Sequence, residues 1–310
     1  MNGVLNICKE KGYTSHDVVA KLRGICHQKK IGHTGTLDPM ATGVLPVCFG
    51  NATKLCDFLS DRMKTYRAVM LLGKTSDTYD VTGVMSTIMK DADVMRIEET
   101  AVREAVLSFV PGYEQIPPMY SAKKVDGKKL YELARKGVEI ERKAVRVELP
   151  SIELNEIRMP HVTFAVTCSK GTYIRSLIHD IGQKLTCGAV MEDLVRTASG
   201  GFVIEDALPL SEIEKMAHSG TGFPGHFGEE MLASHMVATD AALSMYPAVR
   251  AKAEADKALL NGNLFPASMV DITHMQDGQI CRVYRAGGDF VGLFTYEVKD
   301  GRFRPYKMFL

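Results

Sequence analysis

The sequence lacks several patterns that would assign it to a specialised class of protein. Its 310 residues contain no tryptophan, an absence that by itself excludes nothing. The seven cysteines are scattered, odd in number and never spaced as C-x-x-C, so we expect neither a zinc site nor a disulfide framework. The first residues lack the basic-then-apolar plan of a signal peptide, and no apolar run approaches the ~18 residues of a membrane helix. We therefore expect a cytoplasmic protein with no membrane partner.

The composition is that of an ordinary globular protein. Hydrophobic residues make up 45% of the chain and charged residues 24%. The length suffices for one large domain and a small one, and the sequence contains no internal repeat or low-complexity tract.

Charge is distributed unevenly along the chain, although the net charge is only +1. Residues 120–147 carry nine basic and four acidic side chains, whereas residues 205–256 carry nine acidic and three basic ones. A basic segment on a near-neutral body is compatible with local binding of a polyanion. Charge alone nevertheless favours a solvated helix face and loop.

Hydrophobic patterns predict strands and helices that mix along the first two thirds of the chain. Strands are predicted over residues 3–8, 43–50, 64–73 and 161–169. Helices are predicted over residues 14–28, with Thr14 or Ser15 as N-cap, and over 52–60, 96–110 and 171–185. Because the order is not a regular βαβ alternation, we expect an α+β domain with a mixed, largely antiparallel sheet flanked by helices.

The last part of the chain is predicted to form a second domain. Glycine, proline and histidine concentrate near the start of residues 218–240, which indicates a break there. A helix is predicted over 248–263, followed by short strands over 278–309 that are joined by AGGD and KDGR turns. We expect one domain over 1–235 and a small β-rich domain over 240–310.

One carboxylate stands in the stretch GHTGTLDPMATGVLPV, residues 32–47. It is Asp38, between a glycine-rich turn and an apolar strand. Asp-Pro initiates turns, and an aspartate side chain satisfies nearby backbone N–H groups, so a turn is the favoured interpretation of this stretch alone. The alternative is a catalytic carboxylate held on a rigid loop.

Two further stretches contain side chains that could act together with Asp38. KTYRA places Tyr66 in a predicted strand, and CSKGTYIRSLIHDIG places Arg175 at the start of a predicted helix. An arginine at a helix start opposes the helix dipole, so we expect Arg175 to meet an anion, for which Asp38 is one candidate.

These motifs, together with IPPMYSAKKVDGKKLYELARKG, resemble the TruB family of bacterial tRNA pseudouridine-55 synthases over about residues 3–200. The resemblance implies the pseudouridine-synthase fold. The C-terminal residues resemble, more loosely, the family's PUA-like RNA-binding domain. One departure is the opening stretch CKEKGYTS, where Glu10 occupies the position at which the family commonly has proline.

The resemblance implies isomerisation of uridine-55 in the T loop of tRNA. The reaction breaks the N1–C1′ bond, rotates the uracil and rejoins it through C5, and it needs no metal or other cofactor. Whether the carboxylate attacks the sugar, attacks the ring or promotes elimination stays open. The family's stand-alone members carry the basic insertion, so we expect a monomer that acts without guide RNA or an obligatory protein partner.

The resemblance also assigns roles to residues near the reacting base. By it, Asp38 is the catalytic carboxylate, Arg175 pairs with Asp38, and Tyr66 stacks on the uracil. Leu194 is an apolar wall of the pocket. Tyr173 is a second wall or simply packs the helix.

Other assignments concern the RNA around that base, which must be flipped out of its loop. His33 matches the histidine that fills the space the base leaves, and Asp80 matches a pocket-side acid, with Asp77 close by. Lys54 is either a phosphate contact or a solvated helix residue. Residues 120–147, the basic segment, correspond to an insertion that closes over the T arm, with candidate phosphate contacts at Lys123, Lys124, Lys128 and Lys129.

Three rival functions remain for the sequence to distinguish. A non-catalytic RNA-binding protein would not need a carboxylate and an arginine beside a stacking aromatic. A nucleotide-hydrolysing enzyme could use GHTGT as a phosphate nest, but the chain lacks G-x-x-x-x-G-K-[ST]. A guide-RNA-dependent relative of the dyskerin type is nearer in class.

Overall fold

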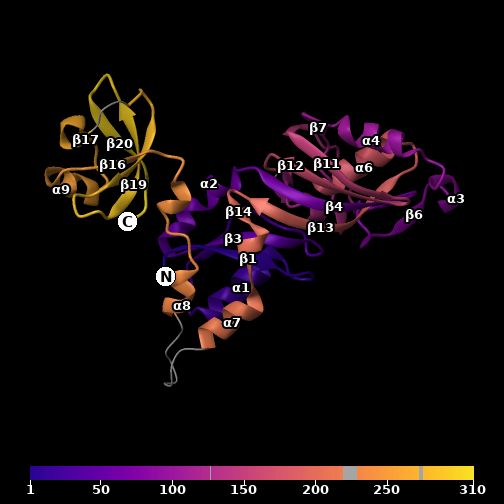
Figure 1. The fold of residues 1–310 in the computed structure, drawn as a ribbon, viewed down its shortest axis with the longest axis horizontal. Helices are drawn as coiled ribbons and strands as arrows, with labels where there is room; N and C mark the ends of the chain where they lie inside the picture. Colours follow the sequence, from indigo (N-terminus) through magenta and orange to yellow (C-terminus); the bar gives the residue numbers. More distant parts are fainter. Residues whose placement is uncertain (126, 219–228, 272–274) are drawn as a thin grey trace.

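A computed structural model describes residues 1–125, 127–218, 229–271 and 275–310 (Figure 1). A large sheet occupies the centre of the first part, and a smaller sheet forms the C-terminal part. None of the helices among these residues is both long and apolar enough to span a bilayer.

The large sheet is mixed and largely antiparallel, as predicted. Its main path runs β11-β12-β4-β13-β3-β1-β15, with β14 paired to β13 and β2 paired to β3. Among the described strands of this sheet, the β1–β15 and β13–β3 pairs are parallel and the other pairs are antiparallel. The strands are β1 (Gly3–Lys9), β2 (Ile31–His33), β3 (Thr42–Phe49), β4 (Lys64–Leu72), β11 (Ser151–Arg158), β12 (His161–Cys168), β13 (Ala189–Ser199), β14 (Phe202–Val203) and β15 (Leu208–Pro209).

Helices flank this sheet at both ends, in agreement with the predicted architecture (Figure 1). The helices of this part of the chain, including α5 on the basic segment, are α1 (Ser15–Ile25), α2 (Cys56–Ser60), α3 (Asp91–Val94), α4 (Glu99–Leu107), α5 (Leu130–Ala134), α6 (Ile174–Lys184), α7 (Leu210–His218) and α8 (Glu229–Ser234), with 3-10 turns η1 (Gly50–Leu55) and η2 (Ile204–Asp206). The N-cap of α1 is Thr14, which closes a capping box with Asp17. Ser15, the alternative cap, instead bonds the backbone of Leu37.

Several predicted helices are shorter in the structure. The helix expected over 96–110 is α4, and the one expected over 52–60 begins as the 3-10 turn η1 before α2. The helix expected over 171–185 starts at Ile174. Apolar residues just outside the helices, such as Ile97 and Phe109, also pack against the core, so apolar periodicity extends beyond the residues that are helical.

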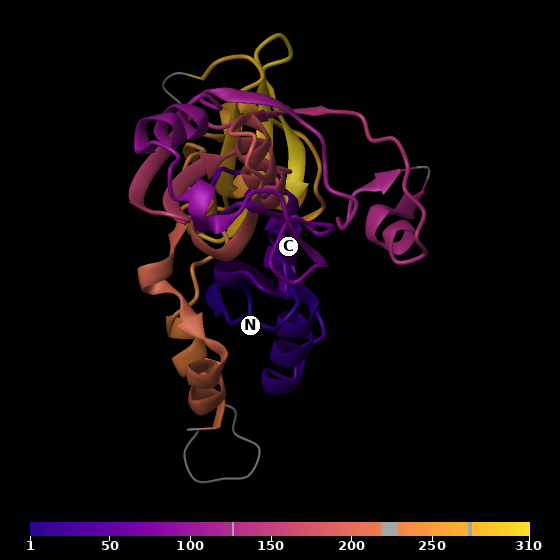
Figure 2. The same ribbon diagram turned by 90° about the vertical axis from the view of Figure 1, so that its right-hand side faces the viewer.

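The basic segment leaves the body between two paired strands. Strands β7 (Gly112–Gln115) and β10 (Val145–Glu148) are antiparallel and close its base. Beyond them lie the hairpin of β8 (Lys124–Val125) and β9 (Lys128–Lys129) and the helix α5. Figure 2 shows this segment projecting sideways from the sheet. A second hairpin, β5 (Lys74–Ser76) with β6 (Met85–Thr87), lies against β13.

The C-terminal part has a five-stranded sheet of its own, in the order β16-β18-β19-β20-β17. Phe265, Phe294 and Phe303 are fully buried in its core. The elements are η3 (Ala241–Leu243), β16 (Ala248–Arg250), η4 (Ala253–Ala255), α9 (Asp256–Leu260), β17 (Phe265–Pro266), η5 (Ala267–Met269), β18 (Ile280–Tyr284), β19 (Phe290–Glu297) and β20 (Arg302–Met308).

The helix predicted over 248–263 is wrong at its start. Residues 248–250 form β16, where Val249 is buried and pairs with Val283 of β18, and only residues 256–260 are α-helical. Pairing at the sheet edge therefore overrides the helix propensity of the alanine- and lysine-rich stretch. The predicted turns do connect β18 to β19 and β19 to β20. Of the predicted break over 218–240, residues 219–228 lie outside the described residues.

The two sheets are joined by a shared apolar cluster. Val4 and Cys48 of the large sheet pack with Leu243, Leu293 and Phe309 of the C-terminal part. All five are buried, so the contact is a small core of its own rather than a linker.

Gly43 is the position at which the parallel β3–β13 contact is tightest. Its φ is +99°, and a Cβ there would lie 2.2 Å from the carbonyl oxygen of Arg196. Gly12 has a similar φ of +92° with open space around it. We expect Gly43→Ala to lower the free energy of unfolding by about 3 kcal/mol or more, and Gly12→Ala by only about 1 kcal/mol. Denaturant titration of both variants measures the difference, and equal losses would contradict the argument.

Candidate active site

Asp38 lies on the loop between β2 and β3, and that loop is fixed by its backbone. The carbonyl of Asp38 accepts from the N–H of Ala41 at 3.0 Å, which closes a turn. The carbonyl of Pro39 accepts from the N–H of Gly12, and the N–H of Leu37 donates to Ser15. The favoured interpretation of this stretch, a turn, therefore holds for the main chain. The Asp38 side chain is not used by the turn and remains available.

Lys9, at the end of β1, ties this loop to the loop that follows β1. Its buried ammonium donates to the carbonyls of Glu10 at 3.0 Å, Tyr13 at 2.7 Å and Pro39 at 3.3 Å. Burial lowers the pKa of Lys9 to about 8, while the charge of Asp38 opposes that shift. Glu10, which stands where the family commonly has proline, contributes only its main-chain carbonyl to these bonds. The difference in side chain at this position therefore leaves the arrangement intact.

Arg175 meets the carboxylate of Asp38. Its Nε donates to Asp38 Oδ2 at 2.8 Å, and its side chain is 6% exposed, against 35% for that of Asp38. The two terminal nitrogens donate to the carbonyls of Thr78 at 2.9 Å and Tyr120 at 3.0 Å. The guanidinium is thus held by three segments of the chain. Asp38 is left partly open to an incoming molecule.

Asp80, rather than Asp77, faces this guanidinium. Asp80 Oδ2 lies 3.6 Å from Nη1 of Arg175, and the carboxylate is 6% exposed. Its other oxygen accepts from Thr78 and from the backbone of Thr82. Asp77 is exposed and accepts instead from the N–H of Val84. Of the two acids that the sequence offered, the structure brings Asp80 to the site.

Tyr66 lies on β4 and interacts electrostatically with Asp38. It is 8% exposed and lies opposite Arg196 of β13 in the sheet register. Burial raises the pKa of its hydroxyl, and the charge of Asp38 acts in the same direction. The hydroxyl is therefore protonated near neutral pH and lies within electrostatic range of the carboxylate.

Arg196 is a site residue that the sequence reasoning missed. It is 1% exposed, and it donates from Nε to the carbonyl of Val44 at 2.6 Å and from Nη2 to that of Gly35 at 3.2 Å. It therefore holds the start of β3 and the glycine turn before Asp38. The available signal was an arginine at the centre of a strand of mostly apolar residues, because such a charge requires internal partners.

Tyr173 and Leu194 approach the same region from α6 and β13. Tyr173 is the N-cap of α6 and is half-buried. Burial raises the pKa of its hydroxyl, and the charge of Asp38 adds to the shift. Leu194 is 5% exposed and pairs with Ala68, two residues along β4 from Tyr66. Tyr66 and Tyr173 both lie within electrostatic range of Asp38, and Leu194 belongs to the same core cluster as Tyr66.

His33 ends β2, at the approach to the Asp38 loop. Its Nδ1 accepts from the N–H of Gly35 at 3.3 Å, and its ring meets that of His16 edge-on at 5.2 Å. Burial lowers the pKa of His33 to about 4, with the charges of His16 and Arg196 contributing. The imidazole is therefore neutral at physiological pH.

The candidate lysines lie away from this group. Lys54 of η1 donates to the carbonyl of Leu310 at 3.1 Å, and burial together with the charges of Lys30 and Lys307 lowers its pKa. The other candidates lie on the basic segment, where Lys124 pairs with Lys129 across the hairpin. They are Lys123, Lys124, Lys128 and Lys129, all exposed or half-buried.

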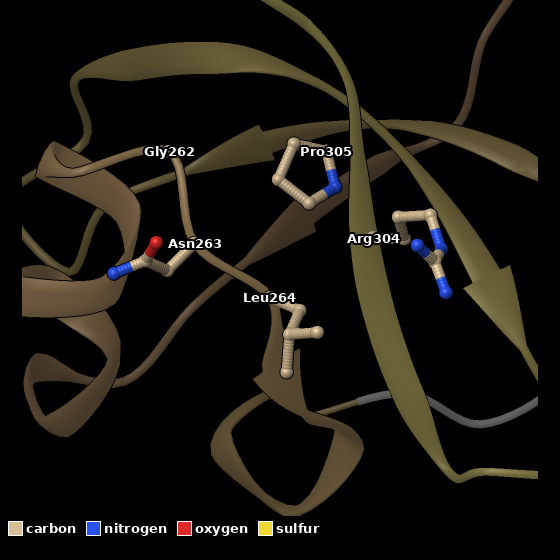
Figure 3. A pocket seen from close by; sticks show the side chains of 5 residues that line it. All are labelled: Gly262, Asn263, Leu264, Arg304 and Pro305. Atoms are coloured by element: carbon tan, nitrogen blue, oxygen red, sulfur yellow. The ribbon is translucent and has the colours of Figure 1, made fainter.

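No competing centre of chemistry is found in the described part of the chain. Its histidine, cysteine and acidic side chains nowhere gather in the groups of three that would suit a metal ion. A hollow of about 620 Å³ in the C-terminal part is lined by Gly262, Asn263, Leu264, Arg304 and Pro305 (Figure 3). The residues that line it carry no carboxylate and no nucleophile, and Arg304 is paired with Glu297.

Comparisons with known proteins agree with this arrangement. Residues 23–174 match the family model described as TruB family pseudouridylate synthase (N terminal domain). Residues 175–244 match that of the tRNA pseudouridylate synthase B C-terminal domain.

Relatives match over their full length. The chain is 42% identical to tRNA pseudouridine synthase B of Clostridium kluyveri and 46% identical to that of Lachnoclostridium phytofermentans, with 100% of both chains covered in each case. Identity to the protein of the same name from Alkaliphilus oremlandii is 45%, over 97% of this chain and 95% of that one.

Solved structures share the fold, which confirms the predicted pseudouridine-synthase architecture. One chain of a Cbf5-Nop10-Gar1 complex matches with a TM-score of 0.72 and 26% identity, over 99% of this chain and 85% of that one. A chain of an archaeal box H/ACA sRNP Nop10-Cbf5 complex matches with a TM-score of 0.70 and 25% identity, over 100% and 86%. With this fold, and with relatives so similar over their full length, the chain belongs to the TruB family of pseudouridylate synthases.

Proposed function

We propose that this protein isomerises uridine-55 in the T loop of tRNA to pseudouridine, with Asp38 as the catalytic carboxylate. The observation that carries the proposal is the Asp38–Arg175 pair, in which a carboxylate held at 2.8 Å from a buried guanidinium keeps one side open. The names of the most similar relatives support a tRNA substrate.

The chemistry requires a charged acid, a stacking surface and little else. Breaking the N1–C1′ bond and forming the C5–C1′ bond moves one proton from C5 to N1, with no change of oxidation state. Arg175 places a positive charge against the carboxylate of Asp38, with Nε 2.8 Å from Oδ2. Tyr66 supplies a ring for the uracil to stack on, and its protonated hydroxyl is the candidate for proton transfer.

A uridine inside a folded loop must leave the stack to reach Asp38. The neutral, half-buried His33 ring at the approach to the loop is suited to filling the vacated space by stacking. The lysines of the basic segment would bind backbone phosphates on the T arm, while the shape of the loop selects the base. Lys54 lies by the C-terminal part and would contact phosphate there.

The chain is proposed to act alone, as a cytoplasmic monomer. Every residue of the constellation comes from one chain, and residues 1–235 would form the catalytic domain, with 240–310 as a PUA-like RNA-binding domain. The Cbf5 structures are complexes with other proteins, but their identity to this chain is 25–26%, against 42–46% for the tRNA pseudouridine synthase B relatives. This difference favours guide-independent activity over the dyskerin-type alternative.

The decisive experiment is incubation of the purified protein with an unmodified tRNA transcript and no guide RNA, followed by mapping of pseudouridine. A new pseudouridine at position 55 supports the proposal. Binding without modification would favour the non-catalytic RNA-binding protein, and nucleotide hydrolysis would favour the nucleotide-hydrolysing enzyme.

Asp38→Asn keeps the side-chain shape and removes the carboxylate. We expect turnover to fall by on the order of 10⁴-fold or more, while tRNA binding is retained. Single-turnover assays and binding titrations measure the two effects separately. A rate within tenfold of the parent would exclude Asp38 as the catalytic group.

Tyr66 carries a ring and a hydroxyl whose roles can be separated. Tyr66→Phe retains stacking, so a large loss of turnover with unchanged binding would implicate the hydroxyl. Tyr66→Leu removes stacking as well, which is worth ~1–3 kcal/mol per base, and should weaken both. If both variants turn over like the parent, the uracil does not stack on Tyr66.

Replacement of the four hairpin lysines by glutamine tests the basic segment, with Lys90→Gln as an exposed control elsewhere. If Lys123, Lys124, Lys128 and Lys129 all touch phosphate, the slope of log K against log salt should flatten by about 0.7 to 0.9 per lost contact. We expect an intermediate flattening and a single-turnover rate that changes far less than in Asp38→Asn. An unchanged slope would mean a solvated face, and a collapse of the saturated rate would mean that the segment helps to build the active site.

A further inference from the structure

We propose that Gln115 is a positioning residue for the Asp38–Arg175 pair, acting through the backbone of Tyr173 at the start of α6. Its effect on turnover rests on the proposed function. Its effect on the ion pair does not, because that contact exists in the free protein.

The start of α6 needs an external partner. Tyr173 is the N-cap, yet its side chain makes no capping bond, so the first N–H groups of the helix lack the usual acceptor. Arg175 is the second helical residue, and its guanidinium is buried among fixed acceptors. A displacement of the first turn therefore moves Nε relative to Asp38.

Gln115 supplies that partner from β7. Gln115 is buried, with 1% of its surface exposed. Oε1 accepts from the backbone N–H of Tyr173 at 2.8 Å, and Nε2 donates to the backbone carbonyl of Tyr173 at 3.0 Å. One side-chain amide thus forms hydrogen bonds with both main-chain groups of the N-cap residue. This carbonyl also accepts from Leu177, so it belongs to the first intrahelical bond as well.

A second contact fixes which way the amide points. Nε2 also donates to the hydroxyl of Tyr113 at 2.7 Å, and that hydroxyl donates to Asp180 of α6 at 2.7 Å. Burial and the charge of Asp180 raise the pKa of Tyr113, which keeps the hydroxyl protonated. Since the hydroxyl gives its proton to the carboxylate, it accepts from Gln115. A flipped amide would place oxygen against oxygen at Tyr173.

Gln115 also stands where the basic segment leaves the body. It pairs with Val145 across the β7–β10 ladder, the last pair before the segment departs. The next residue, Ile116, accepts from Ser176 of α6 at 3.2 Å, and Tyr120 accepts from Arg175. The base of the segment and the first turn of α6 are therefore one hydrogen-bonded unit, with Gln115 at its centre.

The test compares Gln115→Met, which keeps length and removes all three bonds, with Gln279→Met, the same change at an amide of the C-terminal part. Hydrogen exchange of the arginine Nε–H groups is measured by NMR on the intact free protein. Arg175 is the reporter because its Nε–H donates to Asp38. Arg196 is the internal reference because its Nε–H donates to the carbonyl of Val44. We expect exchange at Arg175 to rise at least tenfold in Gln115→Met while Arg196 changes less than twofold.

Single-turnover rates with saturating enzyme complete the test. We expect Gln115→Met to lose 10- to 100-fold with tRNA affinity kept within threefold, and Gln279→Met to behave like the parent. In an Arg175→Lys background the loss from Gln115→Met should largely disappear, because the two residues act on one contact.

Several outcomes would overturn the proposal. Equal acceleration of exchange at Arg175 and Arg196 would mean general loosening, and no change at Arg175 would mean that Gln115 does not position it. Should Gln115→Met fail to fold, Gln115→Glu keeps the acceptor for Tyr173 and loses both donors, and the same comparison applies. If the parent forms no pseudouridine, the proposed function fails while the exchange result still decides the role of Gln115.

Discussion

The buried hydrogen bond between Arg175 and Asp38 is the contact on which the arrangement of the site depends. Arg175 brings five donors in a fixed plane, and its acceptors lie on three loops that are far apart in sequence. Burying an arginine that is 6% exposed would be unfavourable in free energy without those partners. Without the arginine, the three loops would have no shared hydrogen-bond donor to hold them together. Asp38, Asp80 and the base of the basic segment are thereby fixed relative to one another.

The positive charges of Lys9 and Arg196, near the Asp38 loop, are stabilised by hydrogen bonds to main-chain carbonyls. Lys9 and Arg196 both direct their hydrogen bonds to backbone oxygens of the segments that flank Asp38. A buried cation bonded in this way stays charged more readily than an unpartnered one, and it adds an attractive field for the nearby carboxylate. These cations lie where they attract an anion at Asp38, and although the charge of Arg196 lowers the pKa of Tyr66, burial raises it by more, so the hydroxyl stays protonated.

Much of this could be predicted from the sequence, because the responsible patterns are local. The alternation of β12, the capping box at Thr14 and the turns near Gly288 and Gly301 all follow from residues adjacent in the chain. The pairing of Arg175 with Asp38 is predicted by the unfavourable placement of an arginine at a helix start and by the family resemblance. Its other acceptors are carbonyls, which carry no sequence signal at all. Gln115 and Arg196 are also bonded mainly to main-chain groups, so the sequence does not predict their partners, and the residues of β16 are predicted as helix because their strand partner lies more than thirty residues away.

The bond from Arg175 to the carbonyl of Tyr120 has an energetic consequence for the basic segment. Swinging the segment away from the body would break this hydrogen bond of a charged group, a loss of about 1.5–3 kcal/mol. The segment is therefore not a free tether, since its closed position is favoured by a group that also touches Asp38. By thermodynamic reciprocity, whatever strengthens the ion pair holds the segment closed, and whatever holds the segment closed strengthens the ion pair.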